Sequence, residues 1–299
     1  MAGTLRTALV PLVAGLDRDD PRTATVVEAI ENLFASLKAP SRAPSLAPTT
    51  VLDLQDQRIY PYGLNFKDAD AEAQARARGA DDSKLPSSDG SEAGFMTLSN
   101  TKALLSLVRK HMSLTSLAGS RMLIDVLFLR LASVLSAESA EDDVSIVPDW
   151  SGLAHGRRPL EGVADYLVAK RPKRYSSLIL SEPVGALSRP DLEHAGTSNV
   201  FEARAFSELA SGLAQAVLAV ASACRENQKE CARGAVTCGD HWIFFAYQAP
   251  KGNDYAKYAR TEVLSVGRGG EGVELVLGVL IDWVENAEVF GPQKYFRIV

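Results

Sequence analysis

Two carboxylates lie within apolar stretches of the sequence, where a charged group is costly unless a function uses it. Asp165 has small or apolar neighbours for three residues on each side, and Glu202 lies between Phe201 and Ala203. Because side chains alternate between the two faces of a strand, Glu202 and Arg204 project to the same side. If the strand that carries Asp165 is the neighbour of this one, two carboxylates and one guanidinium converge.

This combination of groups predicts a metal-dependent reaction. Two carboxylates and a backbone carbonyl form the oxygen-rich ligand set that suits Mg²⁺ or Mn²⁺. Such a cation polarises a phosphodiester and generates a hydroxide nucleophile, while a nearby guanidinium stabilises the developing negative charge. The predicted reaction is therefore phosphodiester hydrolysis. The alternative is a structural pair of half-exposed strand acids, in which Glu202 is simply salt-bridged to Arg204.

The order of these residues along the chain is also informative. Asp165 is followed by Glu202-Ala203-Arg204, then by a helical stretch with Gln215, and then by the segment RGAVTCGDHWIFFAY. This order resembles the PD-(D/E)XK nuclease superfamily, which has the restriction-endonuclease-like fold, and the last segment is similar to many members, particularly uncharacterised fungal ones. The resemblance covers roughly residues 113 to 285.

The resemblance implies a role for several residues. By the resemblance, Asp165 and Glu202 would be metal ligands, and the backbone carbonyl of Ala203 would be a third ligand. Gln215 would orient a water or a phosphate. Asp125 matches the place where the family often carries an additional acid, which would be a further ligand.

One position departs from the family pattern, because Arg204 stands where the family has a lysine. Arginine stays protonated and presents a planar fork, so Arg204 can stabilise charge but cannot act as a base. This departure leaves an alternative function open: a nuclease-fold protein without catalysis that acts as a protein-binding or regulatory, effector-like module. Nucleic acid and a protein partner are therefore both candidate partners.

Other candidate residues have two interpretations each. Gln215 could instead cap a neighbouring carbonyl, and Asp125 could pair with Arg121 one helical turn earlier. A basic cluster flanks the strand of Asp165 and is either a rim that contacts phosphates or the solvated end of a hairpin. The cluster consists of Arg157, Arg158, Lys170, Arg171, Lys173 and Arg174.

Three other kinds of site are not favoured. The spacing of Cys224, Cys231, Cys238 and His241 lacks the Cys-x₂-Cys knuckle of structural zinc sites. No Gly-x-Ser-x-Gly elbow of a serine hydrolase occurs. The glycine-rich segment 267–272 has no Gly-Lys-Ser/Thr ending and is predicted to form a turn before the last helix.

Composition sets outer limits on the function. The 299 residues carry a net charge of −5, which gives no whole-molecule attraction to nucleic acid, so such a role needs a local basic patch. Three cysteines are too few for a disulfide framework, and we expect an intracellular protein, cytoplasmic or nuclear. The most apolar stretch, 122–135, is interrupted by Asp125 and Arg130, so no membrane span is predicted.

The elements that must position these residues follow from periodicity. Helices are expected over 21–38, 99–112, 115–136, 206–224 and 273–285, the second and third of them opened by capping Ser or Thr. Strands are expected in DVSIVPDW, EGVADYLVAK, SSLILSE, SNVFEARA, ARGAVTCG and HWIFFAYQ.

Strands that flank a helix in this way predict an α/β protein with a central mixed β-sheet flanked by helices. Three regions are expected. Residues 1–66 form a helical N-terminal region with a Pro-rich linker, 67–95 a flexible low-complexity loop with almost no large apolar side chain, and 96–299 the nuclease-like domain.

Overall fold

The computed structural model describes residues 51–86, 95–150, 164–183, 186, 197–226, 228–291 and 293–299. These residues belong to one compact unit, Pro48–Val299. The predicted helix over 21–38 and the Pro-rich linker up to residue 48 lie outside the described residues, as do Arg157 and Arg158.

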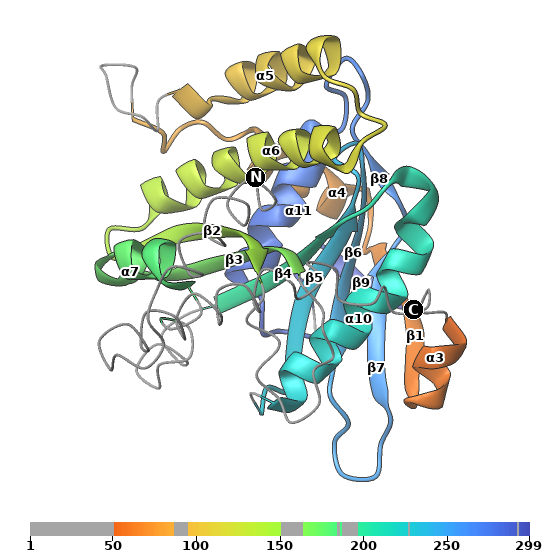
Figure 1. Cartoon of the computed structure of the whole chain (residues 1–299). Helices are drawn as coiled ribbons and strands as arrows, with labels where there is room; N and C mark the ends of the chain where they lie inside the picture. The colour runs from red at the N-terminus through yellow and green to blue at the C-terminus, as the bar shows by residue number, and fades with distance from the viewer. Residues whose placement is uncertain are drawn as a thin grey trace, which may run out of the picture. The chain divides into compact units, whose positions relative to one another are not determined.

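A mixed β-sheet forms the centre of this unit (Figure 1). Its strands are β1 (Ile59–Phe66), β2 (Asp142–Trp150), β3 (Ala164–Pro172), β4 (Thr197–Ala203), β5 (Cys231–Thr237), β6 (His241–Gln248), β7 (Ala256–Thr261), β8 (Leu264–Ser265) and β9 (Phe296–Ile298). They are arranged in the order β2-β3-β4-β5-β6-β7-β1-β9, and β8 pairs with β6. The pairs β4–β5 and β1–β7 are parallel and the other pairs are antiparallel. The predicted mixed sheet is confirmed.

Helices cover both faces of the sheet. They are α3 (Val51–Asp56), α4 (Ala69–Ala80), α5 (Leu98–His111), α6 (Leu117–Glu138), α7 (Ser176–Ser181), α10 (Leu209–Glu226) and α11 (Val273–Glu285). One core layer joins α6 and α11 to the sheet, and the other joins α10 to the opposite face (Figure 1). Hydroxyl side chains cap α5 and α6 as the residue types predict, but the capping residues are Thr97 and Ser116, which accept backbone hydrogen bonds at the two helix starts, rather than the Ser99 and Thr115 that open the predicted segments.

The prediction of a flexible loop over 67–95 is wrong for residues 69–80, which form the helix α4. Ala71, Ala75 and Gly79 form a stripe of small residues that lets α4 approach the backbone of α11. A Cβ atom added at Gly278 of α11 would lie 1.8 Å from the Ala75 carbonyl oxygen, so only glycine fits there. The segment therefore folds by close helix contact rather than by burial of large side chains, and α4 and β1 belong to the same compact unit as the rest.

The prediction of a strand at SSLILSE is also wrong. Residues Ser176–Ser181 form the short helix α7, which follows a 3₁₀ turn over Lys173–Tyr175 and buries Ile179. A short apolar run fits a buried strand and a buried helix equally well by periodicity, so sequence pattern alone could not separate them.

The helix over 206–225 is long and apolar enough to cross a membrane by length and composition alone. It packs on the sheet, since Leu213, Val217 and Val220 are buried in the core layer shared with β5 and β6. This is the pattern of a core helix.

Candidate functional site

The structure brings Asp165 and Glu202 together on neighbouring strands. The register of β3 against β4 pairs Tyr166 with Phe201, which places Asp165 opposite Glu202. The backbone N–H of Ala203 donates to Asp165 Oδ2 at 2.8 Å, and both carboxyl side chains are buried. The convergence that strand alternation predicts is therefore present.

Both carboxylates lie on the sheet face covered by α10. Leu167, two residues after Asp165, is buried in the α10 core layer, and so is Val236, the register partner of Glu202 on β5. Tyr166 and Phe201, which alternate with the acids, pack in the layer with α6 and α11 instead.

The surroundings of Glu202 favour its protonated form. Burial, together with its hydrogen bond to Asp165, raises the pKa of Glu202 well above its ordinary value of 4.5, and the charge of Arg204 only partly opposes this. Glu202 Oε2 is buried without a hydrogen-bond partner, although Arg204 Nη2 lies 3.4 Å away as an ion-pair partner. The site thus holds one oxygen whose capacity to accept is unused.

Arg204 is held in place by α10. Its Nη2 donates to Gln215 Oε1 at 3.0 Å, and its backbone N–H donates to the Thr237 carbonyl at 2.8 Å. A Cβ atom at Gly212 would lie 2.7 Å from Arg204 Cγ, so this glycine makes room for the arginine stem. Gln215 therefore contacts Arg204, and its expected task of orienting a water or a phosphate stays a prediction.

Arg121 of α6 is a site residue that the sequence reasoning missed. Its Nη2 contacts Asp165 Oδ1, and its Nη1 lies 2.9 Å from Asp149 Oδ1. Forty-four residues separate Arg121 from Asp165, so no local pattern could reveal the contact. We call Asp165, Glu202, Arg204, Gln215 and Arg121 the carboxylate cluster.

Asp125 stands beside this cluster rather than in it. Its Oδ1 accepts a hydrogen bond from Tyr166 Oη at 2.8 Å, whereas the ion-pair partners of Arg121 are Asp149 and Asp165. Burial raises the pKa of Asp125, against the opposing effects of the Tyr166 hydrogen bond and of Arg121. The predicted additional ligand is thus engaged with a tyrosine.

The described part of the basic cluster lies at the other end of β3. Lys170 pairs with Thr197, five residues along the strand from Asp165, which is about 16 Å at strand spacing. Arg171 is buried, Lys173 donates to the Ser139 carbonyl, and Arg174 lies over the Tyr175 ring. These residues do not form a rim around the carboxylates.

The residues of the carboxylate cluster fit a hard cation under two conditions. The described ranges hold no group of three or more His, Cys, Asp or Glu side chains that could bind a metal. The two carboxyl groups do supply oxygen ligands, and Glu202 Oε2 is an unused acceptor. Binding requires that Glu202 loses its proton and that Arg121 releases Asp165 Oδ1.

The three cysteines that were considered as zinc ligands do not form a zinc site within the described residues. All three thiols are free and buried, and burial raises the pKa of each. Cys231 Sγ contacts the Glu288 carbonyl, and Cys238 Sγ lies 3.6 Å from His241 Nδ1.

Comparison of the chain with models of known protein families and with curated proteins gave no match. The function must therefore be argued from the site itself.

Proposed function

We propose that the protein is a divalent-cation-dependent hydrolase of nucleic-acid phosphodiesters. The observation that carries the proposal is the direct opposition of Asp165 and Glu202 across β3 and β4, with the fixed cation Arg204 alongside. A buried acid with a raised pKa next to a second acid and a guanidinium is typical of functional sites.

The topology supports the restriction-endonuclease-like fold as part of this proposal. One acid lies on the middle strand of the antiparallel set β2-β3-β4, and the Glu-x-Arg sequence ends the third strand. The helix that follows, α10, directs Gln215 back to the site, and β5 then pairs parallel to β4. This is the order of elements that the family resemblance implies.

Each residue of the carboxylate cluster has a distinct role in the proposal. Asp165, deprotonated Glu202 and the Ala203 carbonyl would hold Mg²⁺ or Mn²⁺, which supplies Lewis-acid polarisation of the phosphodiester and an activated water. The guanidinium of Arg204 binds the non-bridging oxygens and stabilises their charge in the transition state. Gln215 positions Arg204. Arg121 neutralises Asp165 while no cation is bound.

The test is cleavage of labelled single-stranded and duplex DNA and RNA in Mg²⁺ or Mn²⁺. We expect Glu202→Gln and Asp165→Asn each to lower the rate at least about hundredfold, because each removes a ligand charge. Arg204→Lys is expected to retain cleavage and Arg204→Met to lose it. Glu230→Gln is the matched control, since Glu230 is an exposed acid paired with Lys251. Full activity in Glu202→Gln would contradict the proposal.

A second candidate function is a nuclease-fold protein that binds a protein partner without catalysis. It is favoured by the charge balance of the site, because Arg121, Arg204 and the Glu202 proton already compensate both carboxylates. Apolar side chains exposed along α5 and α6 give it a surface: Leu104, Leu107, Leu117, Met122 and Leu129. Absence of Mg²⁺ and Mn²⁺ affinity in a protein that binds a defined protein partner would favour this function.

A further inference from the structure

An exposed aromatic side chain lies beside the carboxylate cluster. Phe206 follows Arg204 by two residues and begins the 3₁₀ turn Phe206–Glu208. It lies three residues after the end of β4, and its side chain is 63% exposed. Its ring lies against the imidazole of His241, with the ring centroids 4.5 Å apart.

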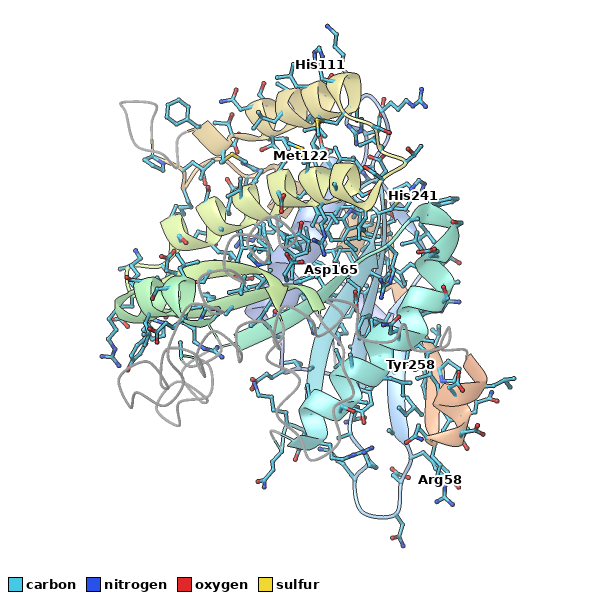
Figure 2. The ribbon with its side chains drawn as sticks, in the orientation of Figure 1. Arg58, His111, Met122, Asp165, His241 and Tyr258 are labelled. Atoms are coloured by element: carbon cyan, nitrogen blue, oxygen red, sulfur yellow. The ribbon has the colours of Figure 1, made fainter. Side chains whose placement is uncertain are left out.

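His241 lies on the same sheet face as the carboxylates. It is the first residue of β6, and Ile243, two positions on, is buried in the α10 core layer. Strand alternation therefore directs His241 to the α10 face. Figure 2 shows His241 beside the start of α10. The 3.6 Å contact between His241 Nδ1 and Cys238 Sγ holds the imidazole on this side of the hairpin.

Arg204 and His241 lie at the same end of three neighbouring strands, β4, β5 and β6. The Arg204 N–H donates to the Thr237 carbonyl, and Thr237 pairs with Trp242, the neighbour of His241. From β4 to β6 is two strand spacings, about 10 Å. A phosphate at Arg204 and a base at Phe206 are thus close enough to belong to adjoining nucleotides of one strand.

We infer that Phe206 and His241 form a stacking platform for an unpaired base, and that the substrate of this site is single-stranded nucleic acid. Aromatic side chains bind single strands by stacking on the faces of bases, whatever the sequence. A base within a duplex is covered by its neighbours and is not free to stack on protein. The inference rests on the proposed function, since it names the substrate class of the same site.

The experiment measures binding in EDTA, so that cleavage does not enter. The probes are DNA and RNA oligonucleotides with one 2-aminopurine, each single-stranded or annealed to its complement. Fluorescence anisotropy gives the affinity, and quenching of 2-aminopurine reports stacking of the base. The variants are Phe206→Ala, Phe206→Trp and, as a matched control, Phe95→Ala, because Phe95 is 65% exposed on a different segment.

We expect the wild type to bind single strands more tightly than duplexes and to quench the probe. Phe206→Ala should lose the quenching and about tenfold in affinity, since one stacked base contributes about 1–3 kcal/mol. Phe206→Trp and Phe95→Ala should behave as the wild type. Unchanged quenching and affinity in Phe206→Ala, equal affinity for duplexes, or no oligonucleotide binding by the wild type would overturn the inference.

The outcome separates this inference from the proposed function. Loss of stacking in Phe206→Ala, combined with cleavage that Glu202→Gln leaves unchanged, would support the platform and remove the assigned hydrolysis. Loss of cleavage in Glu202→Gln, combined with unchanged binding in Phe206→Ala, would support the assigned hydrolysis and overturn the stacking platform.

Discussion

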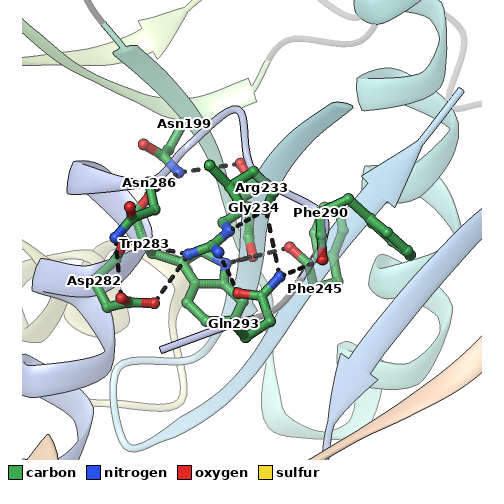
Figure 3. Close-up of polar contacts among 10 residues, drawn as sticks. Asn199, Arg233, Gly234, Phe245, Asp282, Trp283, Asn286, Phe290 and Gln293 are labelled. Carbon is green, nitrogen blue, oxygen red and sulfur yellow. Dashed lines mark hydrogen bonds and ion pairs between the residues drawn. The ribbon is translucent and has the colours of Figure 1, made fainter. Parts of the chain in front are cut away.

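Two groups of buried charges in this chain are built in opposite ways. The first, which we call the Arg233 network, joins Arg233, Asp282, Trp283, Asn286 and Gln293 (Figure 3). Arg233 and Asp282 are each 1% exposed. Arg233 donates to Asp282 Oδ2 at 2.9 Å, to the Val289 carbonyl at 2.8 Å and to Gln293 Oε1, and its guanidinium lies over the Trp283 ring. Asn286 donates to the second oxygen of Asp282 at 3.0 Å.

The carboxylate cluster is incomplete by comparison. It contains an acid whose pKa burial raises, a carboxyl oxygen without a hydrogen-bond partner, and arginine side chains that are 23% and 28% exposed. A buried network in which every charge is paired makes the protein rigid and specifies a single arrangement of the core. A buried network with unpaired groups lowers the stability of the fold. The fully paired Arg233 network is the kind that stabilises a fold, whereas the incomplete pairing of the carboxylate cluster is the kind expected at a functional site, in line with the proposal.

The largest expected effect tests the structural half of this comparison. Asp282→Ala leaves the Arg233 guanidinium buried without a countercharge, which is expected to lower the free energy of unfolding by about 3–5 kcal/mol. Urea denaturation measures it. The control is Glu230→Ala, whose exposed pair with Lys251 should contribute less than about 1 kcal/mol. If the two substitutions lower the free energy of unfolding equally, the buried pair stabilises the fold no more than the exposed pair, which would contradict the comparison.

The second prediction concerns the pH dependence of stability. Because the folded state raises the pKa of Glu202, folded protein binds this proton more tightly than unfolded protein does. The contribution of this proton to the free energy of unfolding is complete below pH 4.5, the ordinary pKa of a glutamate. It declines as the pH rises above this value, by at most about 1.4 kcal/mol per pH unit. Glu202→Gln, which stays neutral, should lack this decline. Denaturation at several pH values above 4.5 compares the two proteins, and parallel curves would contradict the protonated Glu202.

A smaller effect is expected at Arg121. Arg121→Met frees Asp165 Oδ1 for a cation, and the ion pair that it removes is partly exposed and contributes about 1 kcal/mol. The affinity for Mn²⁺ should therefore rise about fivefold. Calorimetric titration measures the change. A lower affinity in Arg121→Met would mean that this arginine supports the site instead of competing with the cation.

The smallest effect is expected at Asp125. Its carboxylate accepts a hydrogen bond from Tyr166, so Asp125→Asn should leave the Mn²⁺ affinity within about twofold of the wild type. The same titration tests this, with Tyr166→Phe as its partner variant. A loss comparable to that in Asp165→Asn would place Asp125 among the ligands.

Local rules predicted much of the site. Alternation along β4 placed Glu202 and Arg204 on one face, and the apolar surroundings of Asp165 marked its burial. The contact of Arg121 could not be predicted, because it joins α6 to β3 across the fold. Phe206 was assigned to a helix, and the proposal of a stacking role for it depends on its exposure and its contact with His241, which the sequence does not show.

Sequence pattern predicted the strands β2 to β6 and missed β1, β7, β8 and β9. The set β2-β3-β4 and the hairpin β5–β6 carry β-branched and aromatic residues, which the pattern detects. β1 contains Pro61 and Gly63, which argue against a strand, yet it pairs parallel with β7 across nearly 200 residues of chain. Such pairing depends on tertiary structure rather than on local preference.

The most direct test of the central claim is calorimetric titration of Mn²⁺ in two buffers of different ionisation enthalpy. The samples are the wild type and the double variant Asp165→Ala, Glu202→Ala. We predict that the wild type binds one cation and releases about one proton, because Glu202 must ionise, and that the double variant does not bind. Absence of binding in the wild type, or equal binding in both proteins, would contradict a metal site at the carboxylate cluster.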